Sequence, residues 1–154
     1  MFSGAATSIR QLSLDEAEAA AEVYLAARAL MTYIPQLPIF EPVSVKRYFR
    51  EILFKTSRVY GAEADGRVIG IIALKEGWIE QLNISPSHTN QGHGVRLIAS
   101  AKASFPTGLQ LWVLEQNTNA IRFYEREGFI TVERTSGERA MEQIPDRRMI
   151  WRPA

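Results

Sequence analysis

The chain has 154 residues, with 18 lysines and arginines against 17 aspartates and glutamates, a formal net charge of +1 at pH 7. This length predicts one domain over residues 1–154, large enough for a hydrophobic core without metals or disulfides. The absence of cysteine excludes disulfides, thiol nucleophiles and thiolate metal sites, and it fits a reducing, cytoplasmic location. Because only His88 and His93 supply imidazole, we expect no metal site.

We expect no nucleic-acid or membrane partner. The nearly balanced charge gives no sign of a basic footprint for nucleic acid or anionic lipid. No segment approaches the ~20 apolar residues of a membrane span. The first residues also lack the basic and apolar regions of a signal peptide.

The first predicted elements are a short strand over residues 9–12 and a helix that begins after Ser13. Ser13 and Glu16 have the spacing of a capping box, and apolar residues then recur at helical spacing. Residues 31–42 contain three prolines, which exclude a regular element, yet the segment is rich in apolar side chains. It is either a loop packed over the core or the wall of a pocket.

A second helix is expected from Ser44, with an apolar face made of Val45, Tyr48, Phe49, Ile52 and Leu53. Strands follow over residues 58–64, 67–74 and 78–84, joined by turns at Asp65-Gly66 and Glu76-Gly77. These short connections predict an antiparallel meander.

The remaining elements are a helix over residues 94–104, a strand over 108–114, a helix from Asn117 that Gly128 closes, and strands over 129–135 and 147–151. A strand, a helix and a second strand in succession imply a parallel pair. The fold class is therefore α/β: a mixed sheet with an antiparallel N-terminal part, a central parallel pair and about four helices.

The strand over residues 78–84 changes its apolar face. Ile79 is odd-numbered, whereas Leu82 and Ile84 are even, and a regular strand keeps one parity on one face. A β-bulge near Glu80-Gln81 explains the change and can splay two parallel strands apart. A strand buried on both faces explains the same pattern.

A glycine-rich turn, Gln91-Gly92-His93-Gly94-Val95-Arg96, opens the helix that follows this strand. Glycines let a ligand approach the backbone, and the first amides of a helix lack internal partners, which suits a pyrophosphate. The same residues also suit an ordinary turn. The P-loop and dinucleotide-binding patterns are both absent.

The most specific stretch runs from Leu109 to Phe129 and reads LQLWVLEQNTNAIRFYEREGF. Asn117 is a natural N-cap for a helix on which Phe123 and Tyr124 join an apolar stripe. Such aromatic residues are commonly core residues. Their combination with the glycine turn and the parity change favours a ligand site.

Together these segments resemble the GNAT superfamily of acyl-CoA-dependent N-acetyltransferases, well over residues 58–129 and elsewhere by element order. The turn matches the family pattern Q/R-x-x-G-x-G/A except at Arg96, where the family usually has glycine or alanine. Arg96 either points away from the cofactor or adds a guanidinium contact to its phosphates. The resemblance implies a GNAT-like mixed sheet whose central parallel strands splay around the cofactor.

The resemblance also implies the residues that bind acetyl-CoA, which enters as co-substrate. They are Leu82, Asn83 and Ile84 on the bulged strand, Gln91, Gly92, His93, Gly94, Val95 and Arg96 in the turn, and Asn117 and Phe123 around the second helix. The turn amides are expected to hold the pyrophosphate. Leu82 and Ile84 are expected to bind the pantetheine arm and the acetyl carbonyl, and Tyr124 to lie near the thioester sulfur.

Two catalytic residues are expected, Tyr124 and Glu80. Because there is no cysteine, we predict direct attack of a primary amine on the thioester in a ternary complex. Glu80 is the first candidate for the base that takes the amine's proton, although it also reads as a surface carboxylate beside the bulge. Weaker candidates are Glu115, Glu138 and Glu142. Tyr124 is expected to donate to the departing sulfur.

The acceptor, a small-molecule or peptide amine, is expected to contact the segments around residues 31–40 and 137–147. Expected contacts are Tyr33, Phe40, Glu138 and Glu142, with Met141 and Asp146 as further candidates. Arg134, Arg139, Arg147 and Arg148 argue against a simple acidic pocket. The alternative function is a non-catalytic acyl-CoA sensor or partner-binding domain of the same fold, and a homodimer is conceivable in either case.

Overall fold

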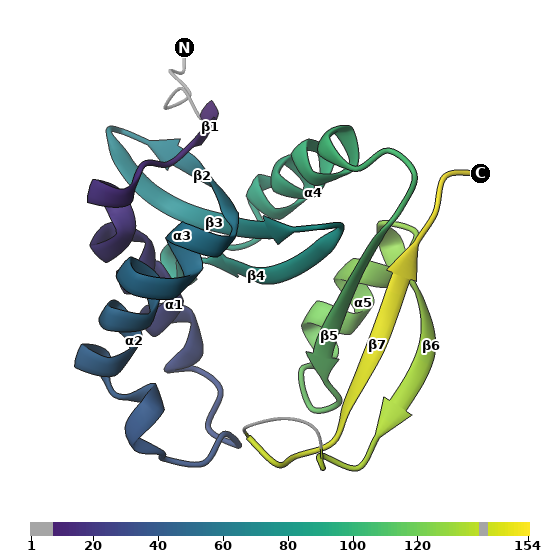
Figure 1. The fold of residues 1–154 in the computed structure, drawn as a ribbon. Helices are drawn as coiled ribbons and strands as arrows, with labels where there is room; N and C mark the ends of the chain where they lie inside the picture. Colours follow the sequence, from purple (N-terminus) through teal and green to yellow (C-terminus); the bar gives the residue numbers. More distant parts are fainter. Residues whose placement is uncertain (1–7, 139–141) are drawn as a thin grey trace.

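The computed structural model describes residues 8–138 and 142–154. Its centre is a seven-stranded sheet with the order β1-β2-β3-β4-β5-β7-β6. The strands are β1 Ser8–Gln11, β2 Arg58–Ala64, β3 Arg67–Lys75, β4 Trp78–Ile84, β5 Leu109–Leu114, β6 Ile130–Thr135 and β7 Asp146–Trp151. Neighbouring strands are antiparallel except β4 and β5, which are parallel. The predicted mixed sheet with an antiparallel N-terminal part is confirmed (Figure 1).

Helices cover both faces of the sheet. They are α1 Ala17–Arg28, α2 Pro42–Tyr48, α3 Phe54–Thr56, α4 His93–Ser104 and α5 Thr118–Arg126, with a π-helical turn over Phe49–Leu53 between α2 and α3. Short 3₁₀ turns lie at Leu14–Glu16, Pro38–Phe40 and Pro86–His88.

Strand β3 lies between two hydrophobic clusters. Ile71 and Ala73 pack with α1, α2 and Phe49, whereas Ile72 and Leu74 pack with α4, α5 and Met149. Because successive side chains of a strand point to opposite faces, β3 is apolar at nearly every position. The result is three layers, with the sheet in the middle.

Local signals in the sequence set several boundaries as predicted. Asp65-Gly66 and Glu76-Gly77 both have positive φ values, between 51° and 83°, the left-handed pair that a two-residue hairpin turn requires. The capping box is formed before α1, where the Ser13 amide donates to Glu16 Oε1 at 3.0 Å. The helix from Asn117 ends as expected at Gly128, whose φ is 95°.

The second helix differs from its prediction. It begins at Pro42 instead of Ser44, and Tyr48 and Ile52 are 39% and 51% exposed instead of buried. The buried residues are Val45, Phe49 and Leu53, which are four residues apart. The π turn adds a residue per turn and so keeps these three in line, which turns Ile52 outward.

The β-bulge on β4 is confirmed. Ala73 pairs with Gln81 and Leu74 pairs with Ile79, so Glu80 is the extra residue between two paired positions. On the other side, β4 pairs with β5 at Trp78 and Gln110, and the Gln110 amide donates to the Gly77 carbonyl at 3.0 Å. Beyond that pair the two strands diverge (Figure 1).

In the described ranges no helix is both long and apolar enough to cross a membrane. Among the same residues, no cluster of three or more His, Asp and Glu side chains could hold a metal ion.

Candidate active site

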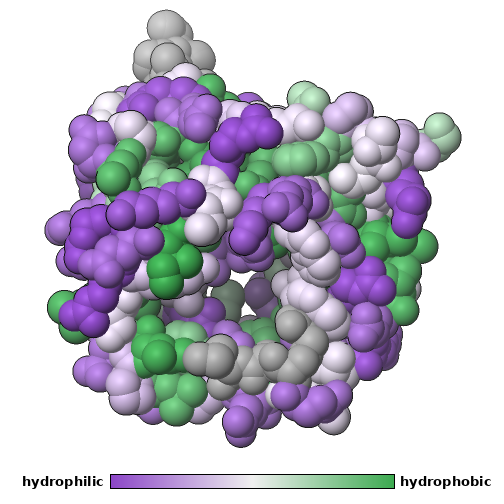
Figure 2. All heavy atoms as spheres, viewed as in Figure 1, coloured by the Kyte–Doolittle hydropathy of each residue, from purple (hydrophilic) through white to green (hydrophobic). Residues whose placement is uncertain are grey.

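A cavity of about 250 Å³ lies where β4 and β5 have diverged. Both strands line it, with the end of α1 and the start of α5. The described lining residues are Arg28, Met31, Ile79, Glu80, Gln81, Leu82, Asn83, Leu111, Trp112, Val113, Leu114, Asn117, Ala120, Tyr124, Glu142 and Asp146. Figure 2 shows that this face is hollowed at its middle, between the α1–α2 side and the β5–β7 side.

Tyr124 lies in the wall of this cavity on α5. The residue is 7% exposed, and its ring packs against Phe123 and Phe129 at centroid distances of 5.4 and 5.5 Å. Burial raises the pKa of Tyr124 well above its ordinary value. At neutral pH the phenol is therefore protonated and can donate a hydrogen bond.

Asn117 positions the helix that carries Tyr124. Its side-chain Oδ1 accepts from the Ala120 amide at 3.3 Å, the N-cap interaction that the sequence predicts. Asn117 and Ala120 also line the cavity. One residue thus both starts α5 and faces the site.

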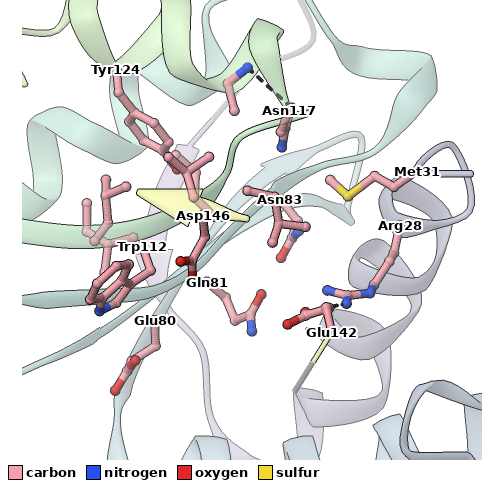
Figure 3. Close-up of a pocket in the computed structure, with 16 residues that line it drawn as sticks. Arg28, Met31, Glu80, Gln81, Asn83, Trp112, Asn117, Tyr124, Glu142 and Asp146 are labelled. Atoms are coloured by element: carbon pink, nitrogen blue, oxygen red, sulfur yellow. Dashed lines mark hydrogen bonds and ion pairs between the residues drawn. The ribbon is translucent and has the colours of Figure 1, made fainter. Parts of the chain in front are cut away.

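Side chains of the bulged strand β4 lie alternately on the two faces of the sheet. Leu82 and Ile84 pack against the core on the α4 side, whereas Gln81 and Asn83 point toward α1 (Figure 3). Asn83 Oδ1 is buried and has no hydrogen-bond partner among the described residues. A buried acceptor without a donor is costly, and a ligand N–H would satisfy it.

Glu80 lies at the bulge and lines the cavity, but its side chain is exposed. Its carboxylate points away from Tyr124 (Figure 3). On the outer side it lies close enough to Tyr48 that its charge, after burial, contributes to raising the pKa of that phenol.

The glycine turn lies at the start of α4. Gly92 has a φ of 85° and is the N-cap residue. A Cβ on Gly94 would lie 3.2 Å from the Phe123 ring, so the absence of a side chain lets α5 pack against this helix start. Gln91, Val95 and Arg96 are exposed. None of the described cavity-lining residues comes from this turn.

His93 and Arg96 interact within the turn. His93 is buried, and its Nδ1 lies 2.6 Å from Arg96 Nη2. Burial and, to a lesser degree, the charges of Arg96 and His88 lower the pKa of His93. The neutral imidazole can accept from the guanidinium, which therefore lies back across the first helical turn.

The residues expected to contact the acceptor are only partly together. Glu142 lines the cavity and pairs with Arg28 at 2.6 Å, and the Arg28 guanidinium lies 4.3 Å from the centroid of the Phe40 ring. Tyr33 is half-buried nearby, which raises its pKa. Glu138 lies outside this cavity, on the surface, where the Ser136 amide and hydroxyl donate to it. Arg139 and Met141 lie outside the described residues.

The other arginines near this region contact carboxylates elsewhere. Arg147 donates to Glu115 at 2.5 and 2.8 Å, and Arg148 donates to Glu133 at 3.0 Å. Arg134 lies 3.8 Å from Glu115. None of these three arginines lines the described part of the cavity.

Several lining residues were not predicted, among them Arg28, Gln81 and Trp112, whereas Met31 belongs to the segment that was expected to form a pocket wall. Trp112 could have been found from the alternation of β5, in which Leu109, Leu111 and Val113 are buried and the even positions face the other side. Arg28 gave no signal, because it reads as the last residue of an amphipathic helix. Asp146, a minor candidate, is 2% exposed and accepts from the Thr135 hydroxyl.

Solved structures share this fold across nearly the whole chain. The PaiA N-acetyltransferase of Thermoplasma acidophilum, in complex with coenzyme A, is 23% identical, with a TM-score of 0.79 over 96% of this chain and 99% of that one. Apo YjaB of Escherichia coli is 20% identical, with a TM-score of 0.78 over 97% of this chain and 99% of that one. PH1933 of Pyrococcus horikoshii is 18% identical, with the same TM-score over 97% and 99%.

No curated protein matches the sequence. Residues 23–129, however, match the sequence model of the acetyltransferase (GNAT) family. This match covers most of the chain and includes the bulged strand, the glycine turn and the helix of Tyr124. The chain belongs to the acetyltransferase (GNAT) family.

Proposed function

We propose that the protein transfers an acetyl group from acetyl-CoA to a primary amine by direct attack in a ternary complex. The observation that carries this proposal is the bulge at Glu80, which opens β4 from β5 beside the buried Tyr124. Family membership supports an acyltransferase. The proposal includes acetyl as the acyl group, nitrogen as the acceptor atom and a cytoplasmic location.

The residues present fit acetyl-CoA. The first-turn amides of α4 suit a pyrophosphate, and the N-cap residue Gly92 has no side chain to cover them. Between β4 and β5, the buried Asn83 Oδ1 suits an amide N–H such as those of pantetheine. A neighbour of the same fold is in complex with coenzyme A.

The amine must lose a proton before it attacks. An alkyl ammonium has a pKa near 10.4, so at pH 7 the neutral form costs about 4.6 kcal/mol. Glu80 is the proposed base. Because its carboxylate points away from Tyr124, the proton is expected to travel to it through water.

The thioester sulfur gains negative charge as it leaves. Tyr124 lies in the cavity wall with a raised pKa, so full proton transfer from its phenol before sulfur departs is unfavourable. Its proposed role is to hydrogen-bond the developing thiolate and protonate it late. The amide of Leu82, on the bulged strand, is the proposed donor to the acetyl oxygen.

Two measurements test this function in sequence. Acyl-CoAs should raise the melting temperature, and acetyl-CoA with a panel of amines should then release free thiol with intersecting initial-rate patterns. Parallel patterns would rule out the ternary complex. Stabilisation by acetyl-CoA without thiol release would instead support the non-catalytic binding domain, and no stabilisation by any acyl-CoA would exclude both.

A further inference from the structure

Arg96 brings a positive charge to the start of α4 that no described carboxylate compensates. The chain has no aspartate or glutamate between Gln81 and Leu114, a stretch that includes all of α4. Within residues 8–138 and 142–154, Arg96 takes part in no ion pair. The N-terminal end of a helix is already positive, so it is an unfavourable place for a cation. An anion bound there would compensate both the guanidinium and the helix dipole.

The guanidinium of Arg96 lies back toward the N-terminal end of the helix. Its Nη2 is 2.6 Å from His93 Nδ1, and a Cβ built on Gly92 would lie 3.6 Å from its Nη1. Helical side chains lean toward the N-terminus, so a residue in the second turn can cover the first. Gly92 is the N-cap residue and has no side chain to cap the first amides. The cation and these amides therefore lie together.

His93 holds the guanidinium in this place. The residue is 4% exposed, and burial, more than the neighbouring charges, lowers its pKa and keeps the imidazole neutral at pH 7. Nδ1 accepts from Arg96, so Nε2 carries the proton and donates to Gln91 Oε1 at 3.3 Å. This contact uses one of the five N–H donors of the guanidinium, and Arg96 is exposed. Further donors are thus left for a ligand.

We propose that Arg96, held in place by His93, binds the pyrophosphate of acetyl-CoA. This inference rests on the proposed function, in which the first-turn amides of α4 hold the same group. A guanidinium can donate two parallel hydrogen bonds to phosphate oxygens, which a glycine or alanine at this position cannot do. His93 is a positioning residue, because it directs the guanidinium without touching the ligand. Of the two orientations that the sequence leaves open for Arg96, the one toward the phosphates is thereby chosen.

Calorimetric titration with CoA, which has no acetyl group to transfer, measures this contact in the full chain. Arg96→Ala should weaken CoA binding about ten-fold at low salt and less at high salt. It removes a cation from the positive end of a helix, so it should not lower the melting temperature of the free chain. Equal affinity of the variant and the native chain at low salt would overturn the proposal.

Arg47 supplies the matched control. It is exposed on α2, which packs on the face of the sheet opposite α4. Arg47→Ala removes the same charge from the chain, and CoA should bind this variant within about two-fold of the native affinity. An equal loss in both variants would mean that net charge, and not a contact of Arg96, attracts the ligand.

A second ligand distinguishes the phosphates of CoA. 3′-Dephospho-CoA keeps the pyrophosphate and lacks the phosphate on the ribose. If Arg96 binds the pyrophosphate, Arg96→Ala should weaken binding of this ligand by the same factor as binding of CoA. If the loss disappears with 3′-dephospho-CoA, the guanidinium contacts the ribose phosphate and the assignment to the pyrophosphate is wrong.

Two substitutions of His93 test its positioning role. His93→Leu removes the acceptor and should weaken CoA binding about three-fold, whereas His93→Gln keeps a side-chain oxygen that can accept from Arg96 and should retain most of the affinity. In a chain that already carries Arg96→Ala, His93→Leu should have little further effect. Additive losses would show that His93 acts by another route, such as packing, and would overturn its role.

The possible failures are distinguishable. If the native chain binds neither CoA nor acetyl-CoA, the proposed function falls and the role of Arg96 with it. If the native chain binds CoA and Arg96→Ala binds it equally well, the role of Arg96 falls and the proposed function stands. Because Arg96 is exposed, its variant decides the matter even if a variant of the buried His93 does not fold.

Discussion

Tyr124 shows how one side chain can serve both the core and the site. Its ring belongs to the hydrophobic cluster with Phe129 and Met149, while the residue also lines the cavity. The ring position is fixed by this packing, so the hydroxyl needs little further ordering to meet a ligand. Burial keeps the phenol protonated, as a donor requires.

Replacement of Tyr124 by phenylalanine separates these two roles. Tyr124→Phe keeps the ring and its packing but removes the donor, so we expect kcat to fall about ten-fold or more. The affinity for acetyl-CoA, measured by calorimetry, should change little. An unchanged kcat, with acetyl transfer as the rate-limiting step, would remove Tyr124 from the chemistry.

The sequence singled out Tyr124 and Asn117, which line the cavity, but not Arg28 or Gln81, which line it too. Tyr124 and Asn117 lie in one short segment, in which a helix N-cap, an apolar helix face and a C-terminal glycine follow one another. Arg28 reaches the site because the end of α1 lies opposite the connection before β7, a contact between residues 114 positions apart. Spacing along one helix cannot reveal such a long-range contact.

The bulge on β4 is the element-scale feature that makes the site possible. One extra residue, Glu80, interrupts the pairing with β3 and moves β4 away from β5 past the Trp78–Gln110 pair. Past that pair no further β4–β5 pairing is formed in the described part of the chain, which leaves backbone groups on the facing edges that the proposed cofactor can bind. The parity change in the sequence predicted this feature because the apolar side chains must still reach the core.

Deletion of Glu80 should remove the bulge, whereas Glu80→Ala should keep it. We expect the deletion to weaken acetyl-CoA binding about 100-fold, because about two hydrogen bonds would be lost. The alanine variant should bind acetyl-CoA within about three-fold of the native chain. Calorimetric titration of both proteins makes the comparison. The deletion also turns Ile79 toward the other face, so circular dichroism must first show that it folds.

If the deletion variant folds and binds acetyl-CoA as tightly as the native chain, the bulge is not what opens the cofactor site. If Glu80→Ala loses binding as well, the carboxylate and not the extra residue is responsible. Each result points to a different cause, because the two variants lack the same side chain but differ in chain length.

At the scale of the whole molecule, the element order and the mixed sheet could be predicted, but the position of the last strands could not. β7 lies between β5 and β6, so the final strand inserts into the sheet instead of extending its edge. Local turn signals specify which strands are adjacent in hairpins. They do not specify where a strand that follows a long connection will pair.

The β1–β4 and β5–β7 parts of the sheet share one hydrophobic cluster on the side of α4 and α5, and a ligand between β4 and β5 would add a further link between them. β4 and β5 are paired at Trp78 and Gln110, and the Arg28–Glu142 ion pair joins α1 to the segment before β7. Between these contacts lies the cavity. Acetyl-CoA bound there would touch both halves and stabilise them together.

Hydrogen exchange measures this coupling. With acetyl-CoA at about 100 times its Kd, the folded state gains about 2.7 kcal/mol, so amides that exchange through global unfolding should slow about 100-fold. We expect this slowing in β3 of one half and in β5 and β7 of the other, because the ligand bridges them. The chain without Glu80 is the control and should show little slowing. Slowing confined to one half of the native chain would mean that the halves unfold separately and that the ligand holds only one of them.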